Sequence, residues 1–350
     1  MTALATIRVS VLVLLLSGVA WVRFEWQGPR PIVATVKGAP SEMGAAVANL
    51  APEKLELLKD RYLRGIVCHG SDELLRRRSE QARAYFPLLS VRHQAEMRAF
   101  AKAAELPLGA AMLANSFLDM EFARAGCRSL VATAGDRLYH AHNLDWDTLA
   151  GMANRVICVV RRKPKEGAFD TVAVTIVGLL GALDIINEHG IALSVNQSAT
   201  GAGARSEPTF LRIRRIAEEC RTFDEARQAL REGGSEVPFH ITLSSARQGK
   251  AAVFESGPAF TERPLTDGVI GIDNSHWGRK RSPVENVALA GDIAEVDEVK
   301  AVLRSPEVLL RCNIYSVIFD YANNRMWLAA GRTPAAPHAY REYRLFRRAR

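Results

Sequence analysis

The spacing of hydrophobic residues divides the chain into two parts with different periods. Between Ser41 and about Ala123, apolar residues recur every three or four positions with few glycines or prolines, which predicts a layer of helices. Beyond Gly126 the apolar runs become short and rich in β-branched residues, which predicts strands. The expected helices of the first part span residues 53–63, 72–85, 89–104 and 110–122.

The second part of the chain reads mainly as strands joined by short turns. Further helices are expected at 209–220, 223–231 and 296–303, and Thr222 with Glu225 forms a capping box at the start of one of them. Runs of strands with helices gathered in pairs predict a layered α+β fold rather than regular βαβ alternation. The expected strands span residues 32–36, 129–132, 138–143, 155–161, 171–177, 191–196, 240–244, 251–255, 268–272, 313–320 and 325–329.

The first residues of the chain have the pattern of an export signal. Arg8 precedes an apolar run from Val9 to Val22, and the small residues at Gly18 and Ala20 suit a signal peptidase. The run is shorter than the roughly 20 apolar residues that a spanning helix prefers. We therefore expect residues 1–25 to be a signal peptide or an uncleaved membrane anchor, which places the protein in the periplasm or at the membrane.

Composition narrows the class of protein. The chain has 350 residues, 48% of them hydrophobic, which is ample for a buried core. Its formal net charge of +8 is spread along the sequence and lacks a zinc knuckle or an aromatic-basic platform, so no nucleic-acid partner is expected. The cysteines are scattered without metal-ligand spacing, which predicts neither a disulfide framework nor a metal site; they are Cys68, Cys127, Cys158, Cys220 and Cys312.

One cysteine, Cys127, lies in a segment that should bring its thiol close to a carboxylate. Residues 126–146 read as a β-hairpin in which Cys127 begins the first strand, so Asn143 and Asp145 at the end of the second strand should lie beside it. A thiol needs a neighbouring base. If the bond before Cys127 were broken, its own α-amino group, with a pKa near ~8, could act as that base. Asp145 would orient the amine, while the alternative is a buried structural cysteine.

This hairpin resembles the nucleophile hairpin of the cysteine N-terminal nucleophile hydrolases. The similar families are acid ceramidase, N-acylethanolamine acid amidase, the bile-salt (choloylglycine) and penicillin V acylases, and especially the acyl-coenzyme A:6-aminopenicillanate acyltransferase group. Cys127 and Asp145 match in type and spacing, and Gly126 matches the self-cleavage junction of the last group. Residues 38–44 also resemble the Gly-x-Pro-x-Glu-x-Gly opening of that group.

Two asparagines carry the resemblance further along the chain. Asn196 ends a segment similar to the family's next strand pair, and Asn274 lies in Asp273-Asn274-Ser275-His276-Trp277, which resembles the segment whose Asn helps to form the oxyanion hole. The resemblance implies a four-layer αββα sandwich. It also implies cleavage after Gly126 into a helical propeptide or α-subunit, residues 26–126, and a catalytic β-subunit, residues 127–350.

The chemistry that the resemblance implies is acyl transfer through a thioester at Cys127. Water would resolve the thioester in an amidohydrolase acting on N-acyl compounds, and an amine would resolve it in an acyltransferase; an inactive envelope-associated relative is the third possibility. Asp145 would orient the amine, with Asn274 and then Asn196 as oxyanion donors. The expected partner is a small N-acyl or acyl-thioester substrate, and no cofactor is expected.

One departure from the family concerns His142, which stands where ceramidase and amidase members carry an Arg directly before the Asn-x-Asp segment. Imidazole is mostly neutral near pH 7 and makes one bond per nitrogen, whereas guanidinium stays charged and forks onto two oxygens. His142 is then either a catalytic residue or a strand residue bonded to backbone. Arg128 and Arg281 are candidates to hold Asp145 instead, although Arg281 could equally cap a loop, and a lower pH optimum is the other way to accommodate the change.

Overall fold

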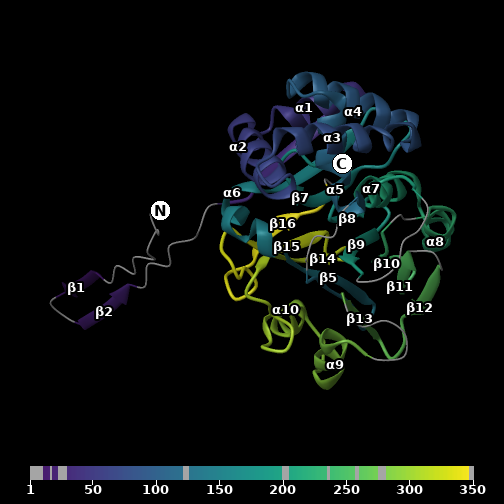
Figure 1. Cartoon of the computed structure of the whole chain (residues 1–350). Helices are drawn as coiled ribbons and strands as arrows, with labels where there is room; N and C mark the ends of the chain where they lie inside the picture. The colour runs from purple at the N-terminus through teal and green to yellow at the C-terminus, as the bar shows by residue number, and fades with distance from the viewer. Residues whose placement is uncertain are drawn as a thin grey trace.

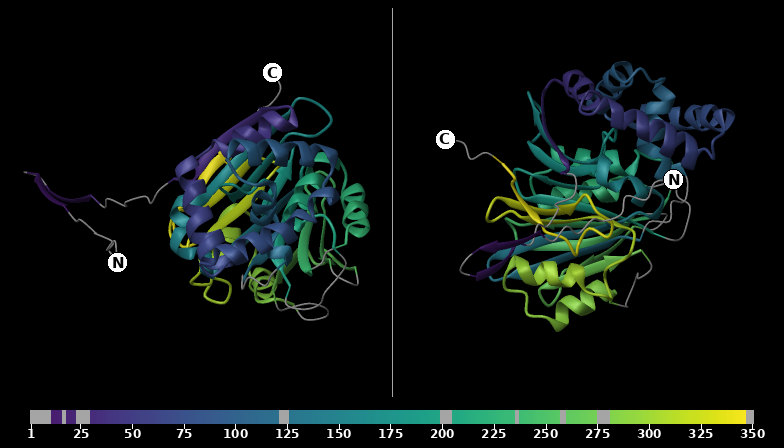
Figure 2. Two further views of the ribbon diagram at one scale, coloured as in Figure 1. Left: turned by 45° about the horizontal axis from the view of Figure 1, so that its top comes forward. Right: turned by 90° about the vertical axis from the view of Figure 1, so that its left-hand side faces the viewer.

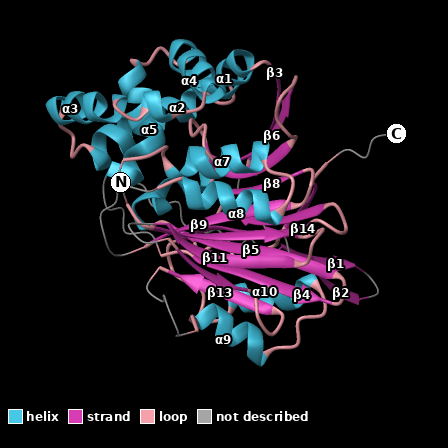
Figure 3. Cartoon of the chain, turned by 90° about the vertical axis from the view of Figure 1, so that its right-hand side faces the viewer, coloured by secondary structure: helices cyan, strands magenta, loops and turns pink. Residues whose placement is uncertain are grey.

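The computed structural model describes residues 11–15, 18–22, 30–120, 126–198, 205–234, 237–256, 260–274 and 281–346. In this part of the chain two large β-sheets pack face to face, and helices cover the outer face of each sheet (Figure 1, Figure 3). Helix, sheet, sheet and helix therefore follow one another through the molecule. The predicted α+β fold with four layers is confirmed.

The larger sheet has eight strands in the order β12-β11-β10-β9-β8-β7-β6-β3. Neighbouring strands are antiparallel except for β3 and β6, which are parallel because β3 reaches the sheet from the helical first part of the chain. The strands are β3 (Ile32–Gly38), β6 (Ile157–Pro164), β7 (Thr171–Ile176), β8 (Asp184–Asn187), β9 (Ile191–Gln197), β10 (Phe239–Ser245), β11 (Lys250–Ser256) and β12 (Thr261–Pro264).

The smaller sheet has six antiparallel strands in the order β13-β4-β5-β14-β15-β16. Its centre is the hairpin of β4 and β5, so the segment that carries Cys127 lies in the middle of the molecule. The strands are β4 (Arg128–Ala134), β5 (Arg137–Asp145), β13 (Val269–Asp273), β14 (Asn313–Asp320), β15 (Arg325–Ala330) and β16 (Arg341–Arg344).

Both faces of the smaller sheet are buried, and this explains why its strands are apolar on both sides. Val131 of β4 faces the larger sheet and packs with Val253 and Ile270, while Leu130 and Ala132 face the opposite way. The outward-facing residues are covered by α9 (Pro283–Ala290) and α10 (Val296–Arg304). A strand that is covered on both faces needs no alternation of polar and apolar positions.

A thicker layer of helices covers the larger sheet (Figure 2). It begins with the first part of the chain, where α2 continues directly into a π-helical segment, Leu58–Val67. The predicted capping box holds the start of α8, where Thr222 and Glu225 exchange hydrogen bonds with each other's backbone. The helices of this layer are α1 (Pro40–Ala48), α2 (Pro52–Leu57), α3 (Asp72–Arg83), α4 (Val91–Ala103), α5 (Leu108–Met120), α7 (Thr209–Glu219) and α8 (Phe223–Glu232).

Buried ion pairs join this helical layer to the sheet beneath it. Glu96 of α4 pairs with Arg162 of β6 at 2.7 Å and also with Arg214 of α7. Arg214 pairs in turn with Glu218 at 2.7 Å, and Glu218 lies 3.0 Å from Nε2 of His93. Because removing one partner of a buried pair leaves an uncompensated charge, this cluster fixes the first part of the chain to the rest. The predicted boundaries at residues 26, 126 and 127 stay predictions.

Within the predicted export segment, the structure places two short strands. They are β1 (Val11–Leu15) and β2 (Gly18–Val22), which pair antiparallel in a two-stranded sheet apart from the body of the molecule (Figure 1). The other residues of 1–25 lie outside the described ranges. Among the helices that the structure describes, none combines the length and the apolar character needed to cross a membrane. Export and anchoring stay predictions.

Candidate active site

The expected hairpin is confirmed, and it brings Asp145 back to the start of β4. Arg128 pairs with Asn143 and Ser129 pairs with His142 across the two strands. At the open end of the hairpin, the backbone N–H of Gly126 donates to the carbonyl oxygen of Asp145 at 3.0 Å. The Gly126–Cys127 bond is therefore held against the end of β5 by the backbone alone.

Cys127 lies directly before β4 and is buried between the two sheets. Its backbone N–H donates to the Oδ1 atom of Asn274, which follows β13, at 2.5 Å. Burial raises the pKa of the Cys127 thiol well above its usual range, and the charge of Asp145 acts in the same direction, while a hydrogen bond from the Asp145 backbone opposes them. The thiol is protonated at neutral pH, so it needs a base before it can attack a carbonyl.

Asp145 ends β5 as a buried carboxyl group with two partners. Its Oδ1 accepts a hydrogen bond from Nδ2 of Asn313 at 3.0 Å, and its Oδ2 lies 3.4 Å from Nη1 of Arg128. Burial raises the pKa of Asp145 to about 8, although Arg128 and Asn313 both favour the charged form. Of the two arginines proposed from the sequence as partners of Asp145, Arg128 is the one that lies beside it.

Asn196 joins the two sheets one step away from Cys127. It lies on β9 of the larger sheet, and its Oδ1 accepts a hydrogen bond from Oγ of Ser129 at 2.5 Å. Its Nδ2 donates to the carbonyl oxygen of Ile272 on β13 at 3.5 Å. Asn196 and Asn274 are both close to the cysteine strand, as the sequence suggested, and both are already engaged in hydrogen bonds within the uncleaved chain.

His142 lies in the middle of β5 and is paired with a carboxylate rather than with backbone. Its Nδ1 is 2.9 Å from the side chain of Asp184 on β8. Asp184 also accepts hydrogen bonds from Ser194 and, at 2.5 Å, from the hydroxyl of Tyr315. Burial alone would raise the pKa of Asp184, but His142 and these donors together lower it, so the buried group is a carboxylate.

Arg281 is not brought to the site. Its side chain is about half exposed, and it pairs with Asp267 at 3.2 Å and with Glu285 at 3.8 Å. The structure therefore does not bring Arg281 to Asp145, and its contacts with Asp267 and Glu285 fit the other predicted role, at a loop. Residues 275–280, which include the rest of the predicted Asn274 segment, lie outside the described ranges.

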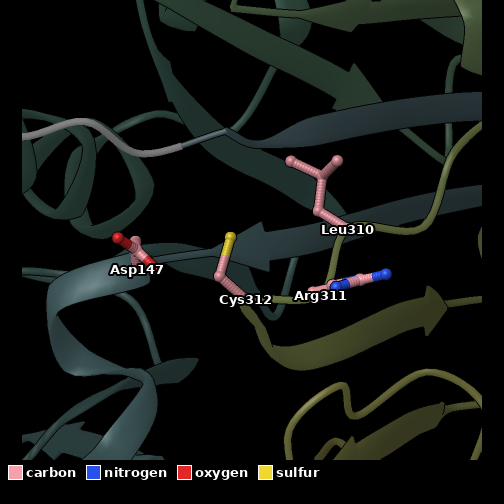
Figure 4. A pocket seen from close by; sticks show the side chains of 4 residues that line it. All are labelled: Asp147, Leu310, Arg311 and Cys312. Carbon is pink, nitrogen blue, oxygen red and sulfur yellow. The ribbon is translucent and has the colours of Figure 1, made fainter.

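A pocket of about 370 Å³ opens beside the junction and is lined by Asp147, Leu310, Arg311 and Cys312 (Figure 4). A Cβ atom placed on Gly126 would lie 2.7 Å from Cδ1 of Leu310, so the wall of this pocket touches the residue before Cys127. The charge of Asp145, added to burial, raises the pKa of the Cys312 thiol, which shows that Cys312 lies near Asp145 as well. The pocket thus reaches the Gly126 side of the bond.

A second, apolar pocket lies between the helical layer and the larger sheet. Trp146, which directly follows Asp145, forms one wall, and its Nε1 donates to the hydroxyl of Tyr62 at 2.8 Å. Phe117 of α5 completes an aromatic cluster with ring centroids 5.7 Å from Tyr62 and 5.9 Å from Trp146. Aliphatic side chains from the helices and from the end of β7 make up the rest of the lining; they include Leu55, Leu58, Leu63, Leu106, Ile176 and Leu179.

Three residues that the sequence analysis did not select have polar contacts at the site: Asp184, Tyr315 and Asn313. Asp184 had a usable signal, because an acid within the apolar run 182–186 must find a partner once it is buried. Tyr315 and Asn313 begin a strand far along the chain and gave no local signal. Within the described residues, no group of three or more His, Cys, Asp and Glu side chains could hold a metal ion.

Comparison with known proteins finds a family model that matches part of the chain. Residues 132–270 match the family model described as acyl-coenzyme A:6-aminopenicillanic acid acyl-transferase. The predicted resemblance is confirmed. The match is consistent with the predicted class of enzyme, a hydrolase of linear amides or a related acyltransferase. The match begins within β4 and ends within β13, so Cys127 and Asn274 lie just outside its two ends.

Solved structures with a similar arrangement share little sequence with the chain. An N-acylethanolamine-hydrolyzing acid amidase ortholog from Caenorhabditis elegans is 18% identical with a TM-score of 0.48, covering 55% of this chain and 92% of its own. A conjugated bile acid hydrolase from Clostridium perfringens is 10% identical with a TM-score of 0.47, covering 62% and 92%. A penicillin V acylase from Agrobacterium tumefaciens is 12% identical with a TM-score of 0.43, covering 58% and 82%. No curated protein sequence matches the chain significantly.

Proposed function

We propose that this protein is a self-processing cysteine amidohydrolase that cleaves linear N-acyl amides through a thioester at Cys127. The observation that carries the proposal is the environment of the Gly126–Cys127 bond. Gly126 N–H is bound by the carbonyl of Asp145, and Cys127 N–H is bound by Asn274 at 2.5 Å. The Cys127 thiol, the backbone of Asp145 and the side-chain amide of Asn274 thus meet at one peptide bond, and the residue before it has no side chain to obstruct attack.

In the first reaction the Cys127 thiol would attack the carbonyl carbon of Gly126. The bond between that carbon and the Cys127 nitrogen breaks, and water then hydrolyses the resulting thioester. The products are a chain that ends at Gly126 and a chain that begins at Cys127. Its new α-amino group takes over the place of the amide nitrogen, beside Asn274 and the end of β5.

In the mature enzyme the α-amino group of Cys127 acts as the base. It accepts the thiol proton while Sγ attacks the substrate amide and returns the proton to the leaving amine. Asp145, held by Asn313 and Arg128, would orient this amine. The side-chain amides of Asn274 and Asn196 would donate to the developing oxyanion, and each such donor contributes about 3–4 kcal/mol to transition-state stability in a well-formed site.

The apolar pocket behind Trp146 supports an acyl group as the part of the substrate that is recognised. Its walls are aromatic and aliphatic, and it lies next to the residue that follows Asp145. Such a wall binds a hydrocarbon chain or an aromatic acyl group by excluding water from it. The pocket beside Leu310 and Cys312, which reaches the other side of the bond, would then receive the amine part.

A second candidate function is acyl transfer from a thioester to an amine, and the matched family model favours it directly. The thioester at Cys127 is common to both reactions, and the outcome depends on whether an amine or water reaches it first. Incubating the mature enzyme with an acyl thioester and a small amine, and quantifying free acid against amide product, separates the two functions.

Export is the proposed setting of the reaction. The apolar run from Val9 to Val22 after Arg8 supports a signal or an anchor at the start of the chain. Fractionation of cells that express the full chain, followed by determination of the first residue of the exported product, tests this part of the proposal.

The acyl-enzyme itself gives the direct test of the proposed function. The purified protein is mixed with N-acyl amides of increasing acyl length, quenched in acid and measured by intact mass. We expect the Cys127 chain to gain the mass of the acyl group and the Cys127→Ala control to gain none. Hydrolysis that persists in Cys127→Ala would contradict the proposal.

A further inference from the structure

The uncleaved chain lacks the base that serves the mature enzyme. Before cleavage the nitrogen of Cys127 is an amide that donates to Asn274, and it cannot accept a proton. Burial meanwhile raises the pKa of the Cys127 thiol, so the thiolate is scarce. The first reaction therefore requires a different proton acceptor near Sγ.

His142 is the candidate for such an acceptor, because within the described part of the chain one of its ring nitrogens is unused. Its Nδ1 is held 2.9 Å from Asp184, whereas its Nε2 is buried and has no hydrogen-bond partner among the described residues. When the imidazole is neutral, the Asp184 carboxylate keeps the ring proton on Nδ1, and Nε2 then carries a free lone pair. A buried nitrogen without a hydrogen bond is rare in native structures, and a catalytic role is one explanation for it.

The neighbouring histidine on the same strand shows the contrast. His140 is two residues away and faces the same side of β5, but both of its nitrogens are used. Nδ1 lies 2.8 Å from Oγ of Ser244, and Nε2 lies 2.8 Å from Oγ of Ser194. His140 therefore has the contacts of a structural histidine, with a partner at each ring nitrogen. His142 has a partner at Nδ1 but none at Nε2 among the described residues.

The open nitrogen lies on the same face of the sheet as the thiol. Ser129 is directly opposite His142, and Cys127 precedes Ser129 by two residues, so the three side chains project toward the larger sheet. Cys127 and His142 are thus diagonal neighbours on adjacent strands. The Cα atoms of such neighbours are about 7–8 Å apart, a separation that a ring side chain such as that of His142 can span. Asp184, which pairs with Nδ1 of His142, also raises the pKa of the Cys127 thiol through its charge.

We infer that His142, oriented by Asp184, is the base that activates Cys127 for cleavage of its own chain. This inference rests on the proposed self-processing. The Sγ proton moves to Nε2 of His142 as the bond between Sγ and the Gly126 carbonyl carbon forms. Nε2 returns the proton to the Cys127 nitrogen as the bond between carbon and nitrogen breaks. Water then adds to the thioester, giving the Gly126 carboxylate and restoring the thiol.

Asp184 is a positioning residue in this account, and Tyr315 and Ser194 support it. They hold the carboxylate from two other directions, so it cannot turn away from Nδ1. Among the described residues, Asp184 and Tyr315 lie beside His142, and Cys127 and His140 share its face of the sheet. Burial lowers the pKa of His140 to about 3 and keeps it neutral. The Asp184 carboxylate is therefore the negative charge next to the His142 ring.

The test measures how fast the full chain converts into two chains, using intact mass against time. His142→Asn keeps a donor for Asp184 but cannot accept a proton, and Asp184→Asn removes the carboxylate. We expect both variants to cleave at least about 100-fold more slowly than the unaltered chain, the range that loss of a general base produces. His93→Asn is the matched control, since His93 is also buried beside a carboxylate, Glu218, but lies on α4 in the helical layer.

Cleavage of His142→Asn at the rate of the unaltered chain would overturn the inference while leaving Cys127-dependent processing intact. Should that variant fail to fold by circular dichroism, His142→Ala with added imidazole decides. Restoration of cleavage by imidazole supports a base at this position, and a folded His142→Ala protein that imidazole does not restore contradicts it. An unaltered chain that never cleaves would overturn the self-processing proposal as well.

Discussion

At the Gly126–Cys127 junction, burial changes the protonation state of the two ionisable groups, Cys127 and Asp145. It keeps the Cys127 thiol protonated, and it raises the pKa of Asp145 to about 8 despite the Arg128 and Asn313 contacts. The sequence predicted that Cys127 and Asp145 lie side by side, because a hairpin places its two ends together whatever surrounds it, and the resemblance selected Cys127 as the nucleophile. It did not identify Asp184, because pairing with His142 depends on which face of β8 meets β5.

Replacing Gly126 by alanine should slow self-cleavage. The added Cβ would lie 2.7 Å from Cδ1 of Leu310, closer than carbon atoms normally approach, so either the Leu310 side chain or the junction must shift. A shift of this kind at a reacting bond costs about 10- to 100-fold in rate. The double variant Gly126→Ala with Leu310→Ala should recover most of the rate, and equal rates for both variants would contradict this reading of the contact.

Asp145→Asn should change how stability depends on pH. The folded-state pKa of about 8 lies above the value near 3.9 expected when unfolded, so the neutral carboxyl favours folding below about pH 4 and this contribution is lost as pH rises through 8. Because Asn does not ionise, the Asp145→Asn variant should not show this loss of stability as the pH rises. Each pKa unit corresponds to about 1.4 kcal/mol.

Urea unfolding of Cys127→Ala, with and without Asp145→Asn, measures this difference in a chain that stays whole. Between pH 5 and pH 8 the single variant should lose on the order of 2–4 kcal/mol more than the double variant. Parallel pH profiles for the two proteins would show that Asp145 titrates normally in the folded chain.

At the scale of elements, the strands that the sequence predicted are those whose boundaries are marked by local turns. β4, β5, β10 and β11 fall within a few residues of expectation for this reason. The short strands β8, β12 and β16, with four residues each, were not predicted, because so short a run has no period of its own. The helix α9 was also missed, although Ser282 caps it and Pro283 begins it.

The side chain of Asn313 ties the end of β5 to the start of β14. Its Nδ2 donates to the Leu144 carbonyl and to Asp145, and its Oδ1 accepts from the backbone N–H groups of Ala335 and Ala336. Asn313→Ala should lower the free energy of unfolding by about 2–4 kcal/mol, because buried backbone groups lose their partners. It should also slow self-cleavage, since Asp145 loses its orientation.

Chemical unfolding and cleavage rates of the Asn313 variants check this account. Asn313→Asp keeps the acceptor for Ala335 and Ala336 but sets a second acid against Asp145, so it should retain more stability than Asn313→Ala while still cleaving slowly. If Asn313→Ala unfolds at the same urea concentration as the unaltered chain, the junction is not held as described.

At the scale of the whole molecule, the segment before the junction is part of the fold. β3 adds a parallel strand to the edge of the larger sheet, and Glu96 reaches through the helical layer to Arg162 and Arg214. The sequence predicted a helical layer before Cys127 and a strand-rich region after it, and both are confirmed. It could not predict the ion pairs between them, because charges that pair across 66 and 118 residues leave no local pattern.

The two chains produced by cleavage should therefore remain together. They should co-elute in size exclusion even in 1 M salt, because buried pairs are hardly screened. Glu96→Ala leaves Arg162 and Arg214 without their shared acid and should destabilise the protein by about 3–5 kcal/mol. Arg76→Ala, which removes an exposed arginine paired on the surface of α3, is the control and should change stability little. Separation of the chains in buffer would contradict this arrangement.

The central claim is that the chain cleaves itself at Cys127. The most direct measurement is the intact mass and N-terminal sequence of the purified protein beside Cys127→Ala prepared identically. We predict two chains in the unaltered protein, one beginning at Cys127, and a single uncut chain in the control. One uncut chain in both would contradict the account, because no α-amino group would then exist to act as the base.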